Sequence, residues 1–250
     1  MALPSVFTER AAPPCFFADL HFPLSGAAMV AVQKANQFLS LHMRNEIDLL
    51  TQDTPHVTLY LTQWQPSSNT TLDHTLSSAL HGLSKRICDV SLSNAFAVGQ
   101  YAMVNVTVSP CLRQYSDTVV NATHKYSRPN QTVPAWVYNL PDGRERREKI
   151  AYVRRYGSPN VFDQFQPHVT IGWANSTEAV ARAVAALSFE PIAFRANVAA
   201  LGTTGPHGTV LSGKDMARFN LTVHTGVATR SRGVSLNRPP SVRPTPRRDR

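Results

Sequence analysis

Apolar residues recur along this chain with two periods, one typical of strands and one typical of helices. Short alternating or continuous apolar runs predict strands, and longer stretches with apolar positions three or four residues apart predict helices. Strands are expected at residues 16–22, 57–61, 90–98, 103–108, 169–173, 192–201 and 210–223. Helices are expected at residues 26–42, 72–87, 112–126 and 180–187. Because strands and helices follow one another without strict alternation, the pattern predicts the α+β class.

A hairpin signal lies between the third and fourth predicted helices. Asp142-Gly143 follows a proline and separates two short segments, residues 135–140 and 149–156. Asp-Gly is favoured in the tight turns that join antiparallel strands. The two segments are therefore expected to pair as strands.

The tetrapeptide Pro-His-Val-Thr occurs twice, and the sequence around the two copies is similar. The first copy is residues 55–58 and the second is residues 167–170, with an aliphatic residue next in each. Each copy lies in a predicted strand, which leads through a polar stretch of Asn, Ser and Thr into a predicted helix. These residues are good helix N-caps. The repeated unit is thus strand, turn and helix, which indicates an internal duplication.

Strand geometry assigns the side chains of each copy to two faces. Residues two apart point to the same side and lie roughly 6–7 Å apart. His56 therefore shares a face with Thr58, and His168 shares a face with Thr170. Each strand offers one imidazole and one hydroxyl, and a pseudo-twofold arrangement of the two halves would bring the two surfaces together.

A third His-x-Thr triplet has different surroundings. His207-Gly208-Thr209 follows a Gly-Pro pair, and these two residues are the strongest local breakers of regular structure. The triplet is expected in a turn, and His207 is interpreted as a loop histidine without a part in the site.

The two strand-borne motifs resemble the signature of the 2H phosphoesterase superfamily, whose members carry two His-x-Thr/Ser motifs. The resemblance covers roughly residues 15–222, and residues 156–168 also resemble the approach to the second motif in the 2′,5′-RNA ligase-like branch. It implies a bilobal, duplicated α+β fold. Two antiparallel sheets, related by a pseudo-twofold axis, would flank a central cleft, with helices on the outer faces.

The chemistry of the motifs suits a phosphodiesterase that opens 2′,3′-cyclic phosphate ends of RNA or nucleotides. Such a reaction needs a base to deprotonate water and an acid to protonate the departing ribose oxygen. Imidazole titrates near neutrality and can fill either role. His56 and His168 are the predicted catalytic pair, with acid and base unassigned, and the hydroxyls of Thr58 and Thr170 are predicted to bind the phosphate. No cofactor or metal is expected, because neither motif contains an acidic or thiol ligand.

Two other functions stay open at this point. The superfamily also contains 2′,5′-phosphodiesterases and 2′,5′-RNA ligases, as well as the AMP-binding domain of a kinase-anchoring protein. The intact histidine pair favours an enzyme, but the sequence does not separate hydrolysis, ligation and nucleotide binding without turnover.

Aromatic residues near the motifs are candidates for stacking on a base. By strand alternation Tyr60 shares the face of His56, whereas Trp173 belongs to the core face. Trp64 is also expected to be structural. The stacking candidates are Tyr60, Tyr156, Phe162 and Phe165.

The formal net charge is +9, and most of it lies at the end of the chain. Residues 230–250 contain seven arginines and one aspartate, so 7 − 1 = +6 of the charge falls there. This Arg/Pro-rich composition predicts a disordered tail over residues 227–250 that can contact RNA phosphates. Residues 1–14 are expected to be flexible, and residues 15–226 are expected to form the phosphoesterase domain, with two interleaved lobes.

The cysteines and the hydropathy of the chain indicate where in the cell the protein is expected. The three cysteines, Cys15, Cys88 and Cys111, form no Cys-x-x-Cys motif, so neither a disulfide framework nor a zinc site is expected and a reducing compartment is favoured. The chain has neither a signal-peptide pattern nor an apolar run near the roughly 18 residues of a membrane helix. We expect a monomer in the cytoplasm or nucleus that binds no membrane. A mitochondrial location stays open, although residues 1–14 contain only one arginine.

Overall fold

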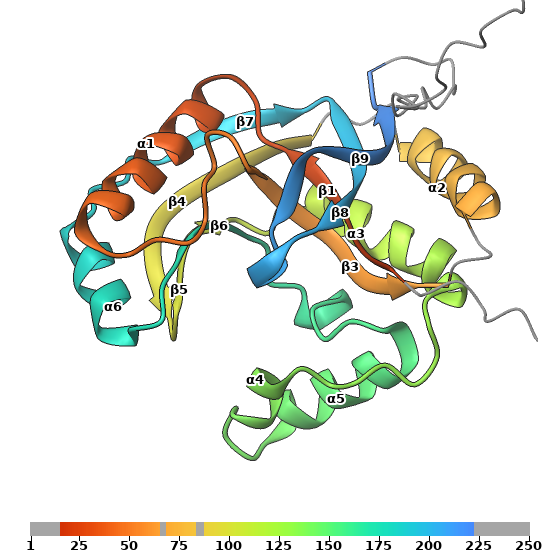
Figure 1. The fold of residues 1–250 in the computed structure, drawn as a ribbon. Coiled ribbons are helices and arrows are strands. Elements are labelled where there is room, and N and C mark those ends of the chain that lie inside the picture. The colour runs from red at the N-terminus through yellow and green to blue at the C-terminus, as the bar shows by residue number, and fades with distance from the viewer. Residues whose placement is uncertain (1–15, 66–68, 84–87, 223–250) are drawn as a thin grey trace, which may run out of the picture.

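The computed structural model describes residues 16–65, 69–83 and 88–222. These residues form two curled antiparallel sheets with helices packed against them (Figure 1), which confirms the predicted α+β fold. The predicted flexible N-terminus and the Arg/Pro-rich tail lie outside the described residues. In the described ranges no helix is long and apolar enough to cross a bilayer.

Each sheet combines strands that follow one another in the sequence with strands that are far apart, and neighbouring strands are antiparallel. The first sheet contains, in spatial order, β2 (Asp53–Thr54), β9 (Val210–Asn220), β8 (Val198–Thr204), β1 (Phe16–Pro23) and β3 (His56–Trp64). The second sheet contains β6 (His168–Trp173), β5 (Tyr101–Val106), β4 (Cys88–Val98) and β7 (Ile192–Ala196). The two motif strands, β3 and β6, are each an edge strand, and they lie close to one another.

Helices from one part of the chain pack on strands from another part. Although α1 (Gly26–His42) follows a strand of the first sheet, it packs on the second sheet beside α6 (Thr177–Ala186) (Figure 1). The helices α2 (Asn69–Leu83) and α3 (Pro110–Thr123) pack together, and α3 lies against β3. All four helices are where the apolar period predicts them, and residues 84–87 of the second prediction lie outside the described residues. Short 3-10 turns are η2 (His124–Tyr126), η3 (Phe162–Gln164) and η4 (Pro206–Gly208).

The single strand predicted over residues 192–201 is two strands in different sheets. β7 pairs with β4 in the second sheet, whereas β8 pairs with β1 and β9 in the first. The exposed Asn197 stands between them. Both strands consist largely of apolar residues, so the pattern does not reveal that the chain crosses from one sheet to the other.

The hairpin predicted around Asp142-Gly143 is wrong, because this region is helical. α4 (Ala135–Tyr138) and α5 (Arg144–Tyr156) occupy it. A type I′ turn needs positive φ at both central residues, and Gly143 is extended with φ −179°. Asp142 instead forms an ion pair with Arg146 of α5 at 2.8 Å. The helix ends at Gly157, which is in the left-handed region that glycine favours at such ends.

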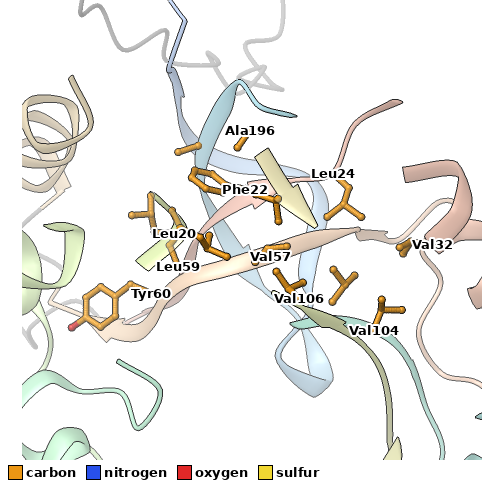
Figure 2. Close-up of a cluster of buried hydrophobic side chains, with 14 of the residues drawn as sticks. Leu20, Phe22, Leu24, Val32, Val57, Leu59, Tyr60, Val104, Val106 and Ala196 are labelled. Atoms are coloured by element: carbon orange, nitrogen blue, oxygen red, sulfur yellow. The ribbon is translucent and has the colours of Figure 1, made fainter. Parts of the chain in front are cut away.

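One hydrophobic core joins the two sheets. Figure 2 shows Leu20, Phe22 and Leu59 of the first sheet together with Val104 and Val106 of the second, and all five are buried. Burying an aliphatic or aromatic side chain of this size contributes about 1.5–3 kcal/mol. The shared core therefore holds the two motif strands in a fixed relation.

A disulfide bond joins Cys88 of β4 to Cys111 of α3. The prediction that the cysteines form no disulfide framework missed this bond, because spacing rules do not detect a pair that only tertiary packing brings together. The Cα atoms lie 5.7 Å apart although the residues are separated by 23 positions. The bond also removes the cysteine argument for a reducing compartment.

Candidate active site

The first motif strand contains a β-bulge directly after its threonine. Leu20 of β1 pairs with Tyr60, whereas the next residue, His21, pairs with Thr58. Leu59 is therefore an extra residue on β3. A bulge of this kind reverses the alternation of side chains beyond it.

The second motif strand has a bulge at the corresponding place. Ala102 of β5 pairs with Gly172, whereas Met103 pairs with Thr170, so Ile171 is the extra residue on β6. The two copies thus share a bulge as well as a tetrapeptide. In both, the side chains before the bulge follow the predicted alternation and those after it do not.

The predicted placement of Tyr60 on the face of His56 is wrong because of the first bulge. Tyr60 is only 1% exposed and packs edge-to-face on Trp64, which is structural as expected. The Tyr60 hydroxyl donates a hydrogen bond to the carbonyl of Tyr156. The bulge turns this ring into the core, where no face of it is free to stack on a base.

The predicted placement of Trp173 on the core face is only partly right, because the ring packs against the core but is not enclosed by it. Trp173 is half-buried and stacks on His207, with ring centroids 4.0 Å apart and planes 18° apart. His207 lies in the turn η4, as predicted, with a φ of 62°, and its Nε2 is 3.3 Å from a carboxylate oxygen of Glu46. The bulge therefore places an aromatic pair on the face of β6 that carries His168.

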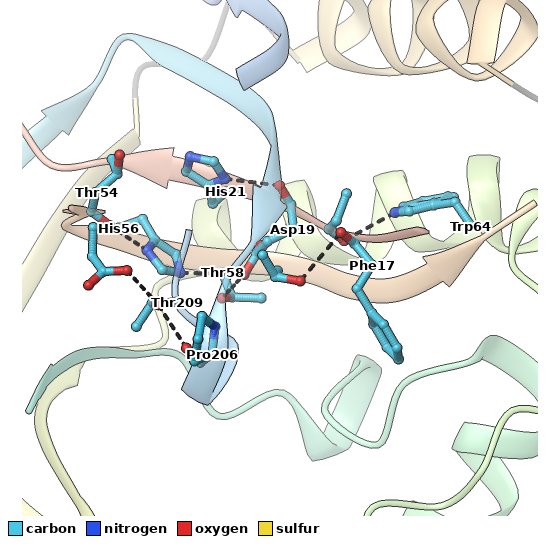
Figure 3. Close-up of polar contacts among 12 residues, drawn as sticks. Phe17, Asp19, His21, Thr54, His56, Thr58, Trp64, Pro206 and Thr209 are labelled. Atoms are coloured by element: carbon cyan, nitrogen blue, oxygen red, sulfur yellow. Dashed lines mark hydrogen bonds and ion pairs between the residues drawn. The ribbon is translucent and has the colours of Figure 1, made fainter. Parts of the chain in front are cut away.

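His56 is buried, and each of its ring nitrogens faces an acceptor (Figure 3). Nδ1 donates to the carbonyl of Thr54 at 2.7 Å, and Nε2 lies 3.4 Å from Oδ2 of Asp19 on β1. A carbonyl and an ionised carboxylate only accept hydrogen bonds. The two contacts are satisfied together only by the imidazolium form, which carries a hydrogen on both nitrogens.

The surroundings of His56 favour its protonated form. Burial favours the neutral ring, but the hydrogen bond and the charge of Asp19 outweigh it and raise the pKa of His56 above its usual value. The carbonyl of Thr54 and the charge of Asp53 act in the same direction.

His168 has one acceptor where His56 has two. Its Nδ1 donates to the carbonyl of Gln166 at 3.0 Å, two residues back in the chain, as in the first motif. The neutral ring with its hydrogen on Nδ1 satisfies this bond and leaves the lone pair of Nε2 available. Burial is the largest influence and lowers the pKa of His168 below its usual value. The hydrogen bond to Gln166 raises the pKa, the charge of the nearby His56 lowers it, and the charge of Asp19 has the smallest effect and raises it.

A third histidine, His21 of β1, contacts the ring of His56. The two rings meet edge-to-face with centroids 5.1 Å apart. Nδ1 of His21 donates to the carbonyl of Asp19 at 2.9 Å. Burial and the charge of His56 lower the pKa of His21 to about 4, so His21 is neutral at pH 7 and adds no second cation beside His56.

The two motif threonines differ in what their hydroxyls contact. Thr58 donates to Oδ2 of Asp19 at 2.5 Å, so its single proton is used inside the protein. Thr170 is half-buried on β6. Phosphate binding by both hydroxyls stays a prediction, and in the first motif it requires Thr58 to exchange Asp19 for the phosphate.

The remaining stacking candidates divide by burial. Phe165 is only 5% exposed and belongs to the core. Tyr156 and Phe162 are half-buried, with ring centroids 4.8 Å apart. The carbonyl of Phe162 accepts a hydrogen bond from Arg113 at 2.7 Å. Tyr156 and Phe162 therefore stay candidates for contact with a base.

Asp19 and His21 are not among the site residues predicted from the sequence, although the sequence contains a signal for them. They stand two residues apart in an otherwise apolar strand, and both are fully buried. Buried charged residues are rare unless they are paired. Two ionisable residues on alternate positions of a core strand therefore point to a functional face.

The arrangement combines an imidazole with an acceptor at each nitrogen, a second imidazole with an acceptor at Nδ1, and a buried carboxylate. Such a pair of imidazoles can donate a proton to one atom of a bound group and accept one from another. Among the described residues, no three His, Cys, Asp or Glu side chains are grouped as metal ligands.

The chain is similar to one family and to several solved structures. The model of the 2′-5′ RNA ligase superfamily matches residues 27–208. No curated protein matches the chain. Among solved structures, E. coli LigT complexed with 3′-AMP is similar, with a TM-score of 0.49 and 13% identity over 84% of this chain and 100% of that one. TT0787 of Thermus thermophilus is also similar, with a TM-score of 0.47 and 14% identity over 82% of this chain and 98% of that one.

Proposed function

Since this chain belongs to the 2′-5′ RNA ligase superfamily, we propose that it is a metal-independent phosphodiesterase acting on 2′,3′-cyclic phosphate ends of RNA or nucleotides. His56 is the general acid and His168 is the general base. The substrate phosphate sits between the two motif strands, within reach of both imidazoles.

The reaction consists of one displacement at phosphorus. Nε2 of neutral His168 takes a proton from a water molecule, whose oxygen forms the new bond to phosphorus. One ribose P–O bond breaks, and the imidazolium of His56 donates its Nε2 proton to the departing oxygen. The product is a ribose phosphomonoester with a free neighbouring hydroxyl. Proton exchange with solvent restores both rings.

The observation that carries this proposal is the difference between the hydrogen-bond acceptors around the two rings. Two acceptors flank His56, and its pKa is raised, whereas one acceptor binds His168, and its pKa is lowered. Between those two pKa values most molecules hold the acid protonated and the base neutral. The reverse assignment would leave only a small fraction of the enzyme in the active form.

Product analysis with purified full-length protein in the presence of EDTA tests this function. We expect hydrolysis of 2′,3′-cyclic AMP and of RNA with a cyclic phosphate end, and a matched linear 3′-phosphate RNA should stay unchanged. Cleavage or joining of 2′,5′-linked RNA without opening of cyclic phosphates would replace the proposal by the 2′,5′-phosphodiesterase or ligase alternative.

A binding module without turnover is the second candidate, and one observation favours it. Both nitrogens of His56 and the hydroxyl of Thr58 are already engaged within the protein. A ligand phosphate would have to compete with Asp19 for these donors. Calorimetric titration with AMP distinguishes the two functions, because binding without hydrolysis of any of the substrates above would support the module.

A further inference from the structure

Asp19 is the most deeply buried charged group of the site. It lies on β1, a strand with neighbours on both sides, and is 0% exposed. Within the described part of the chain its Oδ1 has no hydrogen-bond partner. A buried carboxylate oxygen without a partner costs folding free energy. Its presence in the strand beside a motif histidine calls for a role other than stability.

The other oxygen of Asp19 is where two donors of the first motif meet. Oδ2 accepts the hydroxyl proton of Thr58 at 2.5 Å and lies 3.4 Å from Nε2 of His56. Figure 3 shows the three side chains converging from β1 and β3. Thr58 thereby orients the carboxylate, and the carboxylate faces the ring.

The second motif has no acidic counterpart to Asp19. Across the ladder, Asp19 pairs with Leu61, the third residue after Thr58, and in the second sheet Tyr101 pairs with Trp173, the third residue after Thr170. The position of Asp19 is therefore taken by a tyrosine beside the second motif.

The position of His21 has an apolar counterpart. His21 pairs with Thr58, and Met103 pairs with Thr170. Tyrosine and methionine together offer the second histidine no anion, so the difference between the two rings originates on the neighbouring strands rather than in the tetrapeptides.

Other charged groups near His56 do not replace Asp19 as the main anion that favours the protonated ring. Asp53 of β2 also favours the protonated ring, but the effect of Asp19 is larger. His21 of β1 and His168 of β6 are held neutral by burial and by the charge of His56. Asp215 of β9 acts on His21.

We propose that Asp19 is a positioning residue that keeps His56 protonated and so makes the first motif the proton donor of the site. This inference rests on the proposed function for its catalytic consequence, but the protonation of His56 can be measured without any substrate. Asp19 touches no atom of the substrate in this scheme and acts through the ring of His56, whose Nε2 it contacts.

The first test is a titration of the histidine rings by NMR in the full-length protein. In the native protein His56 should titrate above the ordinary histidine value and His168 below it. In Asp19→Asn, which keeps the shape and removes the charge, the His56 titration should fall below the ordinary value because burial then dominates. Asp89→Asn, an exposed carboxylate on β4 paired with Arg195, is the matched control and should leave both titrations unchanged.

The second test uses the pH dependence of hydrolysis of a cyclic phosphate. Asp19→Asn should move the alkaline limb of the profile to lower pH and reduce kcat at neutral pH by roughly tenfold or more, the factor that one pKa unit represents. KM should change little. Circular dichroism checks that the variant is folded.

Two results would overturn the inference. One is a His56 titration below the ordinary value in the native protein, which requires no variant to fold. The other is faster hydrolysis by Asp19→Asn, which would make Asp19 an obstacle to phosphate rather than a support for the acid. If the native protein hydrolyses nothing while the His56 titration behaves as expected, the proposed function fails and the assignment of Asp19 stands.

Discussion

The two motif strands begin with the same residues and lie in different electrostatic environments. Each histidine donates from Nδ1 to the carbonyl two residues back, and each strand has a bulge after its threonine. Only His56 faces a buried carboxylate among the described contacts of the two rings. The two motif strands are thus alike in sequence and local geometry, and residues on the adjacent strands make their surroundings unequal. An acid and a base can come from one repeated motif when its neighbours differ.

The largest effect is expected from removing either ring. His56→Ala and His168→Ala should each lower kcat/KM by about 10²–10⁴-fold, the usual contribution of a general acid or base. His74→Ala, at an exposed position of α2, is the control and should keep its activity. Retention of more than about a tenth of the activity in both motif variants would remove the catalytic role from the pair.

The next largest effect is a loss of stability when the disulfide bond between β4 and α3 is reduced. Reduction of Cys88–Cys111 should lower the free energy of unfolding by about 3 kcal/mol, as expected for a loop of this length. Urea unfolding with and without reductant measures it. Cys15→Ser is the control and should keep the response to reductant, whereas Cys111→Ser should lose it. A response that persists in Cys111→Ser would show that the effect comes from elsewhere.

A comparable loss of stability is expected from protonation of His21 when the pH falls. The folded ring has a pKa of about 4 and the unfolded ring about 6.5, so the unfolded state binds the proton first. The free energy of unfolding therefore falls by roughly 3 kcal/mol as the pH drops from about 6.5 to about 4, and this group causes no loss above pH 6.5. His21→Gln should flatten the dependence of urea unfolding on pH in this window. An equally steep dependence in the variant would contradict the burial of a neutral His21.

The smallest effect tests the second bulge. A Cβ at Gly172 would lie 2.8 Å from Cε of Met43 and 2.9 Å from Cδ1 of Leu39 in α1. Gly172→Ala should therefore cost about 1–3 kcal/mol of stability through overpacking. Gly82→Ala, at an open position of α2, should be neutral or slightly stabilising. If Gly172→Ala is as harmless as the control, the side chains of Met43 and Leu39 move aside for the added methyl group and the predicted overpacking is absent.

The alternation and the helical period of apolar residues predicted most helices and strands, because both patterns arise when one face of an element is buried. The helix predicted over residues 26–42 matches α1, and both motif strands are present. The same rules failed at Asp142-Gly143, where a helix begins at Arg144 and Gly143 is extended rather than in a tight turn. They also failed at the cysteines, since Cys88 and Cys111 meet only when α3 packs near β4.

The sequence by itself determined the α+β class, the duplicated strand-turn-helix unit and the placement of each histidine on the same face as its threonine. These features depend on local periodicity, which is written in the order of the residues. Only the tertiary structure decided that Tyr60 enters the core, that Trp173 stacks on His207, and that Asp19 meets His56. Bulges and ladder register set those contacts, and both depend on how distant strands pair.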